Sequence, residues 1–282
     1  MPSGLESLNF FGNDFHQNVE ELANAFCGKK IKKLHLEWCK LTSQNAAIII
    51  KSLADELESL DLSENGSLNN NAEDLANAFC GKKIKELNLR YCRLTPQNAV
   101  TIIKSLSELE ILCLDENDLS EDGTAELLAD ALNGQKIKEL ELSCCKLLPQ
   151  DSATIIKSLA DELESLDLSC NDFPENVEDL VDALSCKKIK KLNLGCKLTS
   201  KDTKVKIIEK ADVQTLILDC NFGEATPIIQ ALKQPGCKIE KCVLGDDDWN
   251  RRAQEAINKR VSNQTKLDDT EAFSAFSGCV LQ

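Results

Sequence analysis

A leucine frame of the form LxxLxL recurs ten times along this 282-residue chain, and it limits the possible folds more than any other feature. The frame begins at Leu5, Ile31, Leu57, Ile84, Leu109, Ile137, Leu163, Ile189, Val213 and Ile239. Successive frames lie 24 to 28 residues apart, and residues 49–63 and 155–169 are identical in sequence. A fixed period of this length predicts a solenoid, in which each repeat packs only against its neighbours.

Each repeat changes its periodicity part-way along. The LxxLxL half has the two-residue alternation of a strand with one buried face. Apolar residues then follow at helical spacing, as at Ala46, Ile49, Ile50 and Leu53. Pro96 stands in one of these segments, at a position that the first turn of a helix tolerates. Each repeat is therefore expected to form a strand, a turn, a helix and a return to the next strand.

The ninth residue of the frame alternates between two types. Odd repeats carry Asn13, Asn65, Asn117, Asn171 and Asn221, and even repeats carry Cys39, Cys92, Cys145 and, with one residue deleted, Cys196. A buried turn after each strand leaves backbone groups that need hydrogen-bond partners. An Asn amide both donates and accepts, whereas a thiol is a weak donor that packs like a small apolar group. We expect these residues to form a ladder along the turns.

Charge also alternates, at the second residue of the frame. The residues there are Glu6, Lys32, Glu58, Lys85, Glu110, Lys138, Glu164 and Lys190. Neighbouring strands lie about 5 Å apart, so these side chains are expected to form a row of opposite charges. Each such pair contributes only a few tenths of a kcal/mol, but slippage by one repeat would bring like charges together.

These features resemble the leucine-rich-repeat superfamily over nearly the whole chain. The long helical segments and two alternating repeat forms resemble the ribonuclease-inhibitor-like class. The period near 26 residues and the ninth-position Cys resemble instead the cysteine-containing class of F-box proteins. The resemblance implies an α/β solenoid, a right-handed horseshoe with about ten parallel strands on its concave face and helices on its convex face. Ile84, Leu87, Leu89 and Leu94 are expected to be buried.

Three segments are expected along the chain. Residues 1–248 form the leucine-rich-repeat solenoid, and the last frame in it is degenerate, with Cys242 in a leucine position. Residues 249–265 are predicted to form a helix that caps the open end of the solenoid. Residues 266–282 are small and polar for most of their length, and we expect a flexible tail.

Composition argues against several classes of function. The net charge of −14 does not suit nucleic-acid binding, for which a basic stripe is needed. The sequence contains no apolar run of about 18 residues or more, so no transmembrane helix is predicted. The first residues have no features of a secretory signal. We expect a cytoplasmic protein that does not bind nucleic acid.

The fourteen cysteines raise the question of disulfides or a metal centre. Ninth-position cysteines lie two repeats apart, roughly 10 Å in a stacked sheet. A disulfide needs Cα atoms within about 7 Å, and a structural zinc site needs four ligands around one point. Most thiols are therefore expected to be reduced and buried, with no metal bound. Cys113, Cys144, Cys170 and Cys220 fall at outward-facing positions, where we expect partial exposure.

The sequence predicts no catalytic residue and no cofactor. His35 and Cys39 lie four residues apart and could be a base and a nucleophile, but the ladder position directs Cys39 into the turn. The carboxylates repeat at equivalent surface positions instead of forming one unique pair. There is no glycine-rich phosphate loop. A non-enzymatic protein is expected.

Residues that break the repeat mark a candidate binding site. Outward strand positions mostly carry Ser, Asp, Glu or Asn, against which five residues stand out: Phe11, His35, Trp38, Arg90 and Tyr91. Exposed Trp, Tyr and Arg are enriched at binding hot spots. The structural alternative is that the aromatic side chains cover the strand edge or stack on one another.

Carboxylates surround these residues along the same predicted face. They are Asp61, Glu64, Asp115 and Glu116, with Glu139, Glu141 and Asp167 farther along. Such a face suits a protein partner with a basic surface. We expect a module that binds a folded protein on its concave face. A direct inhibitor of a partner enzyme is the main alternative, and a regulator of small GTPases is a more distant one.

The last four residues read Cys279-Val280-Leu281-Gln282, a C-a-a-X (CaaX) pattern in which Cys279 would carry a prenyl group. One lipid chain gives only marginal membrane binding, so stable attachment to the cytoplasmic face of a membrane would need a second contact. A lone solenoid with this pattern resembles effectors that intracellular bacteria deliver into eukaryotic cells, where the partner would be a host protein. A eukaryotic adaptor would have the same features.

The lipidation hypothesis predicts the behaviour of a Cys279→Ser variant. In eukaryotic cells the wild-type chain should gain the mass of one farnesyl group and sediment partly with membranes, because a terminal Gln favours farnesyl transfer. Cys279→Ser should lose both properties. Gln282→Leu is the matched control, since it should exchange farnesyl for geranylgeranyl. Intact-mass spectrometry and cell fractionation measure these outcomes, and an unmodified wild-type mass would contradict the hypothesis.

Overall fold

The computed structural model describes residues 6–278 except 172, 174–176, 196–199 and 222, with backbone only for 265–278. Cys196 and Cys279 therefore lie outside the described residues. Ten strands form one sheet in chain order, and every neighbouring pair is parallel. They are β1 (Ser7–Asn9), β2 (Lys33–His35), β3 (Ser59–Asp61), β4 (Glu86–Asn88), β5 (Ile111–Cys113), β6 (Glu139–Glu141), β7 (Glu162–Asp167), β8 (Lys188–Leu194), β9 (Asp212–Leu218) and β10 (Lys241–Val243).

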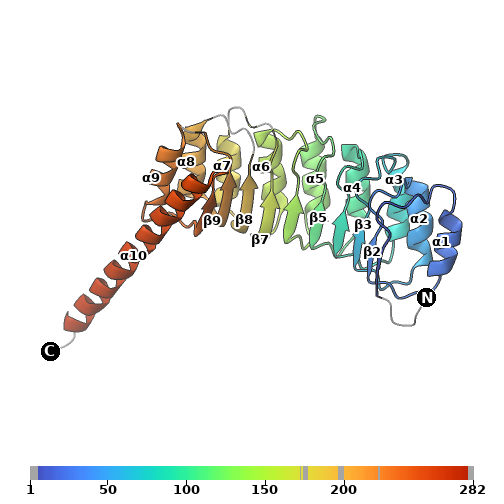
Figure 1. Ribbon diagram of the computed structural model, residues 1–282, viewed down its shortest axis with the longest axis horizontal. Helices are drawn as coiled ribbons and strands as arrows, with labels where there is room; N and C mark the ends of the chain where they lie inside the picture. The colour runs from blue at the N-terminus through green and yellow to red at the C-terminus, as the bar shows by residue number, and fades with distance from the viewer. Residues whose placement is uncertain (1–5, 172, 174–176, 196–199, 222, 279–282) are drawn as a thin grey trace.

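A helix follows each strand, and successive helices pack against one another along the molecule. They are α1 (Val19–Phe26), α2 (Ser43–Ser52), α3 (Ala72–Phe79), α4 (Pro96–Lys104), α5 (Thr124–Leu132), α6 (Pro149–Ser158), α7 (Glu178–Ser185), α8 (Lys201–Lys210), α9 (Ala225–Leu232) and α10 (Asp247–Gly278). Figure 1 shows an elongated, curved molecule with the strands side by side and the helices stacked beside them. The predicted α/β leucine-rich-repeat solenoid is confirmed.

The frame leucines form one continuous core between the sheet and the helices. Ile84, Leu87, Leu89 and Leu94 are at most 1% exposed, as the sequence predicts. The start of α4 follows a local signal, because Pro96 occupies its first turn. Proline is common at this position since its missing N–H is not needed there. Stacking thus buries an apolar stripe that no single repeat could cover alone.

The ladder along the turns forms as predicted, and Asn65 shows how it works. Its side chain is buried, and its Oδ1 accepts the backbone N–H groups of Cys39 (3.1 Å) and Leu41 (2.9 Å). Its Nδ2 donates to the carbonyls of Leu36 (2.8 Å) and Leu62 (2.9 Å). One amide therefore satisfies the turn backbone of its own repeat and of the repeat before it.

Asn117 and Asn171 make equivalent bonds in later repeats. The intervening cysteines continue the ladder with fewer contacts. Cys92 and Cys145 each donate from Sγ to a carbonyl of the preceding repeat at 3.2 Å, and Cys39 does so at 3.1 Å. Two kinds of turn therefore alternate along the solenoid, one closed by an amide and one by a thiol.

The outermost asparagines do not serve as ladder residues in the same way. Asn13 is exposed, and it donates to the carbonyl of Phe10 in its own repeat (2.8 Å). Asn221 is also exposed. Its backbone N–H donates to Glu224 Oε2 (2.9 Å), and the same oxygen accepts from the buried Lys204 (2.7 Å). An ion pair therefore supports the turn of the ninth repeat, while the turn of the preceding repeat, residues 196–199, lies outside the part of the chain that the structure describes.

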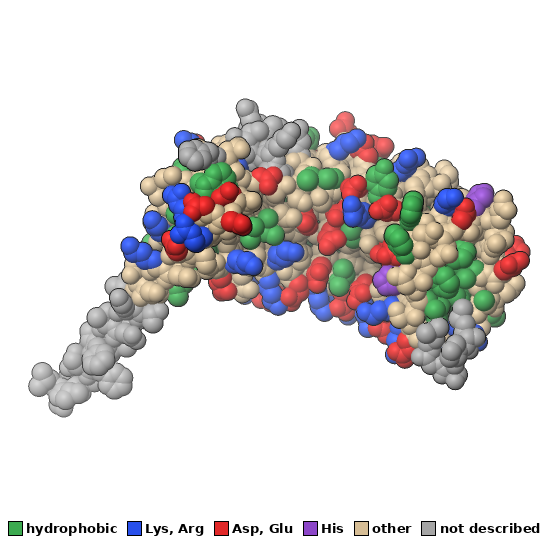
Figure 2. Space-filling view, in the orientation of Figure 1, with side chains coloured by type: hydrophobic (Ala, Val, Ile, Leu, Met, Phe, Trp, Pro, Cys, Tyr) green, Lys and Arg blue, Asp and Glu red, His purple; other side chains and the backbone are tan. Residues whose placement is uncertain are grey.

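The predicted row of alternating charges forms in pairs. Each Glu of an odd repeat binds the Lys of the next repeat, as Lys32–Glu6 (2.9 Å), Lys85–Glu58 (3.4 Å), Lys138–Glu110 (2.5 Å) and Lys190–Glu164 (2.6 Å). All eight side chains keep substantial solvent exposure, so each pair adds little to stability. The lower rim of the molecule in Figure 2 carries blue and red groups in alternation.

The last helix differs in length from the expected cap. α10 begins at Asp247 and continues to Gly278, whereas the sequence suggested a helix over 249–265 and a flexible tail over 266–282. Residues 266–277 contain neither Pro nor Gly, so no strong helix breaker interrupts the turn-by-turn hydrogen bonding. No described helix has both the length and the apolar character that crossing a membrane requires.

The first turns of α10 pack on the final repeat. Ala256 and Ile257 are buried against the end of the core. Arg260 is also buried, and its guanidinium donates to the carbonyls of Leu232 (3.1 Å) and Ile239 (2.5 Å). Leu232 is the last residue of α9, and Ile239 lies just before β10. The arginine thus supplies hydrogen-bond donors to two carbonyls at the end of the stacked repeats.

The ladder predicts unequal effects for two Asn→Ala changes. Asn65→Ala leaves the buried N–H groups of Cys39 and Leu41 and the carbonyl of Leu36 without partners, so we expect a loss on the order of 3 kcal/mol in the free energy of unfolding. Asn13→Ala, at the same repeat position but exposed, should cost less than about 1 kcal/mol. Urea unfolding followed by circular dichroism measures both. Equal losses would contradict the ladder as the source of stability.

Candidate functional site

The candidate residues lie on the side of the sheet that faces away from the helices, which we call the open sheet face. It consists of the fifth, seventh and eighth residues of each frame. Strand alternation directs these residues outward because the fourth and sixth residues are the buried leucines. This face is formed by ten parallel strands, so it is a preformed platform and not a set of loops.

The eighth residues form a row at the ends of the strands, here called the turn row. Its described non-glycine members with positive φ are Trp38, Glu64, Tyr91, Glu116, Cys144 and Cys170, with φ between 52° and 59°. A left-handed conformation costs a non-glycine residue roughly 1–2 kcal/mol. It is held here because the N–H of each residue donates to the seventh-residue carbonyl of the next repeat, at 2.8 to 3.1 Å. The side chains of the turn row are thus fixed at their bases.

Three aromatic side chains are exposed at the N-terminal part of this face. Phe11 is 60% exposed, Trp38 58% and Tyr91 46%. The rings of Phe11 and Trp38 lie 6.1 Å apart between centroids at an interplanar angle of 47°. Trp38 and Tyr91 lie two repeats apart, and the repeat that carries Glu64 separates them. The ring stacking that the sequence left open occurs between Phe11 and Trp38. Both rings remain largely in water despite this contact.

Arg90 is paired with a carboxylate of the next repeat. Its Nε and Nη2 both donate to Oε1 of Glu116, at 2.9 and 2.5 Å. This hydrogen bond is the main reason that the pKa of Arg90 is raised. The guanidinium is still half exposed. The pair therefore presents a fixed donor surface beside Tyr91, which the sequence alone did not predict.

His35 and Asp61 come together with a residue that the sequence analysis missed, Glu37. His35 Nδ1 and Glu37 Oε1 are 3.6 Å apart, and buried Nδ1 of His35 and Oε2 of Glu37 have no hydrogen-bond partner. Asp61 accepts the N–H and hydroxyl of Ser63 at 2.8 and 2.6 Å, and the amide of Asn88 at 2.8 Å. The signal that could have identified Glu37 is its two-residue spacing from His35, which places both on one face.

Asp115 lies at the centre of the open sheet face, in an acidic and half-buried setting. Burial raises its pKa to about 6, with Glu141 and Asp167 adding to the rise and the N–H of Ser143 opposing it. That N–H donates to Asp115 Oδ1 at 2.6 Å. Figure 2 shows red side chains gathered over the middle of this face, with green ones nearer the N-terminal end.

Cys113 corrects one of the exposure predictions. It points outward from β5 but is buried, because Asp115 and Glu141 close over it. Burial is the main cause that raises the pKa of its thiol. Cys144 and Cys170 are exposed and Cys220 is partly exposed, as predicted.

Potential metal-ligand atoms come within 4.8 Å of one another in two triads. These are His35, Glu37 and Asp61, and Cys113, Asp115 and Glu141. Each triad offers three atoms, one fewer than a closed structural zinc site requires. In the second triad burial favours the neutral forms of Cys113 and Asp115, which are poorer ligands than the ionised forms.

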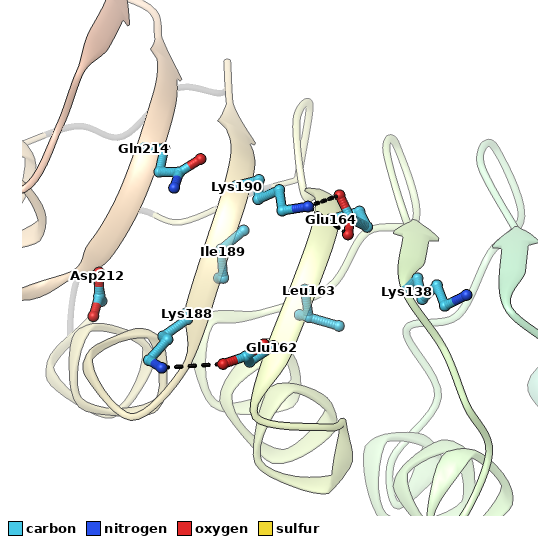
Figure 3. Close-up of a pocket in the computed structure, with 9 residues that line it drawn as sticks. All are labelled: Lys138, Glu162, Leu163, Glu164, Lys188, Ile189, Lys190, Asp212 and Gln214. Atoms are coloured by element: carbon cyan, nitrogen blue, oxygen red, sulfur yellow. Dashed lines mark hydrogen bonds and ion pairs between the residues drawn. The ribbon is translucent and has the colours of Figure 1, made fainter.

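A shallow groove crosses the opposite ends of β7, β8 and β9, away from the turn row (Figure 3). Lys188 reaches across it to Glu162 (3.0 Å), and Lys190 to Glu164 (2.6 Å). These lysines are neutralised by the chain itself and remain exposed. The groove contains none of the predicted site residues, and its paired charges offer no unsatisfied group to a ligand.

Comparison with known proteins gives relatives of one kind. No family model matches the chain. The ribonuclease inhibitor of Mus musculus is 25% identical over 289 residues, covering 93% of this chain and 63% of that protein. The ribonuclease inhibitor of Sus scrofa is 28% identical over 250 residues, covering 80% and 53%. The chain thus spans between about half and two thirds of the length of these relatives.

A solved structure confirms the architecture. The leucine-rich repeat-containing protein LegL7 of Legionella pneumophila matches with a TM-score of 0.59 and 19% identity. The match covers 92% of this chain and 91% of that one. At this identity the likeness concerns the fold alone.

The raised pKa of Asp115 predicts a pH-dependent gain in stability for Asp115→Asn. Because the folded-state pKa lies near 6 and the ordinary value near 3.9, ionisation of Asp115 destabilises the fold increasingly as pH rises from about 4 to 6. The variant keeps an oxygen for the Ser143 N–H. It should be more stable than wild type by about 1 to 2 kcal/mol at pH 7.5, after allowance for solvent screening.

Urea unfolding at pH 7.5 and pH 4.5 measures this difference, which should shrink at the lower pH. Glu110→Gln is a control of opposite sign. Its hydrogen bond to Lys138 lowers the pKa of Glu110, so its loss should reduce stability slightly at pH 7.5. An Asp115→Asn variant less stable than wild type at pH 7.5 would contradict the prediction.

Proposed function

We propose that this leucine-rich-repeat chain is a non-enzymatic module that binds a folded protein on its open sheet face. The observation that carries the proposal is Trp38, a 58% exposed indole fixed on a left-handed turn and flanked by Phe11. The turn is held by the backbone hydrogen bond from the Trp38 N–H to the Ser63 carbonyl. The indole contacts the ring of Phe11 and otherwise faces solvent.

The physical form of the surface favours protein recognition. Trp, Tyr and Arg are the residue types most enriched among binding hot spots, and Trp38, Tyr91 and Arg90 lie within three neighbouring repeats. The sheet beneath them is already ordered, which lowers the entropy cost of association. A hollow beside Trp38, lined by His16, Lys40 and others, offers space for a partner side chain.

The charge of the surface indicates the partner's chemistry. Asp61, Glu64, Asp115 and Glu116 lie on the open sheet face, in the third and fifth repeats, on either side of the repeat that carries Arg90 and Tyr91. A partner with a basic surface would meet this face with complementary potential, which steers the encounter and selects orientation. Asp61 and Glu116 are already hydrogen-bonded to the chain, so we assign them the role of orienting neighbours more than of direct anchors.

A second candidate function is direct inhibition of a partner enzyme. Two relatives carry the name ribonuclease inhibitor, and they match most of this chain. The same open sheet face would then cover the active site of the bound enzyme. Loss of the partner's activity in proportion to complex formation would favour inhibition over simple tethering. A nucleotide-hydrolysis assay tests the more distant hypothesis of a small-GTPase regulator.

The place of action is a separate proposal that rests on the sequence. Prenylation of Cys279 would bring the module to a membrane, and a host protein would be its partner if the chain acts as an effector in a eukaryotic cell. Binding and location would be independent, because Cys279 is far along the chain from the turn row. Recognition should therefore persist in a chain that lacks the lipid.

Substitution of Trp38 tests the proposed binding surface. Immobilised wild-type chain and Trp38→Ala chain are exposed to the same cell lysate, and proteins retained only by wild type are identified by mass spectrometry. Titration calorimetry with each purified protein then gives the affinity. Truncation of a central aromatic should cost about 2 kcal/mol or more, which is roughly a thirtyfold loss of affinity.

Ile48→Ala is the matched control, because Ile48 is an exposed apolar residue on α2, in the same repeat but on the helix side. It should leave affinity unchanged. Both variants should unfold at the wild-type urea concentration. Unfolding of Trp38→Ala would show that the indole is structural, and equal binding by the folded variant would overturn the assignment of the surface. Catalytic turnover by the pure chain would refute the non-enzymatic reading.

A further inference from the structure

We propose that Cys144 and Cys170 are an oxidisable dithiol on the open sheet face, which closes into a disulfide between two neighbouring repeats. This proposal concerns the isolated chain and does not depend on the partner-binding function. It assigns a modification site to the half of the turn row that carries no aromatic residue.

The backbone places the two cysteines at equivalent positions one repeat apart. β6 and β7 are paired with Glu141 opposite Asp167, three residues before each cysteine. The N–H of Cys144 donates to the carbonyl of Ser169, the residue before Cys170, at 3.0 Å. Adjacent strands lie about 4.8 Å apart, within the 4.4–6.8 Å between Cα atoms that disulfides span.

The side chains leave the backbone in the same direction. Cys144 and Cys170 have φ of 55° and 56°, so the two turns have the same conformation. Both side chains are exposed. The Cys170 thiol is hydrogen-bonded to Cys144, and this contact is the main reason that its pKa is raised. The two sulfur atoms are therefore already neighbours in the reduced protein.

The surroundings favour Cys144 as the sulfur that reacts first. The hydroxyl of Ser143 donates to Cys144 Sγ at 3.7 Å, while the hydroxyl of Ser169 donates to Asp167 Oδ1 at 2.6 Å. Cys170 then serves as the resolving thiol, because it keeps its proton to higher pH.

The ladder cysteines are poor competitors for an oxidant. Cys39, Cys92 and Cys145 are fully buried, and their thiols donate to backbone carbonyls. Burial is the main cause that raises the pKa of each, in Cys92 to about 12. Reaction requires an accessible thiolate. Cys145 follows Cys144 directly in sequence, yet it is directed into the turn and is not available.

The chemistry is thiol–disulfide exchange with a small-molecule disulfide such as oxidised glutathione. The Cys144 thiolate attacks one sulfur of the reagent, which forms a mixed disulfide and releases one glutathione thiolate. The Cys170 thiolate then attacks Cys144 Sγ, which forms the Cys144–Cys170 bond and releases the second glutathione. The two departing glutathione thiolates take up the two protons that the protein thiols lose, and the two electrons lost by the protein thiols reduce the reagent.

The test uses the purified full chain, reduced, freed of reductant and incubated with oxidised glutathione. Remaining thiols are then alkylated and the protein is analysed by intact-mass and peptide mass spectrometry. The wild type should lose two hydrogen atoms and yield a peptide pair that joins the segments of Cys144 and Cys170. Cys170→Ser should instead accumulate a stable glutathione adduct on Cys144, because no resolving thiol is present.

Cys144→Ser cannot form the bridge. Addition of glutathione to its remaining Cys170 should be at least tenfold slower than bridge formation in wild type. Cys80→Ser, which removes an exposed thiol elsewhere, should form the bridge normally. Circular dichroism confirms that the serine variants are folded, as expected for exposed side chains. The proposal fails if wild type forms no bridge or if Cys170 links to a cysteine other than Cys144. It also fails if Cys170→Ser still loses two hydrogen atoms, because an intramolecular disulfide would then form without Cys170.

Discussion

The hydrogen-bonded ladder of Asn and Cys side chains is the interaction on which the rest of the structure depends. A solenoid turns each strand back toward a helix inside the molecule, and the turn leaves N–H and carbonyl groups that water does not reach. Asn65, Asn117 and Asn171 satisfy these groups in two repeats at once, while the intervening thiols fill the same place with fewer bonds. The turn geometry set by this ladder also fixes where the eighth residue of each repeat points.

The repeating unit of the structure is therefore a pair of repeats. The ladder alternates between amide and thiol, and the charge row alternates between Glu and Lys with each Glu bound to the Lys that follows. Both patterns share one register. Slippage by one repeat would place thiol turns where amides are needed and would bring like charges together, so the two patterns specify the same stacking.

The residues proposed to bind a partner lie at positions that escape this regularity. Along the turn row the eighth residue is free to vary because its backbone, not its side chain, makes the structural bonds. The row consequently carries an indole, a phenol and carboxylates in its N-terminal half, and thiols beyond them. A rigid scaffold with variable, outward side chains suits recognition, and it also keeps two thiols close enough to react with each other.

The sequence by itself determined the period, the strand and helix order, the ladder, the charge pairing and the exposure of Phe11, Trp38 and Tyr91, because each follows from a local pattern repeated in every unit. The tertiary structure decided what depends on a residue one repeat away. It buried Cys113 beneath Asp115 and Glu141, paired Arg90 with Glu116 and brought Cys144 beside Cys170. These partners are about 26 residues apart in the chain, and only stacking brings them within a few ångströms.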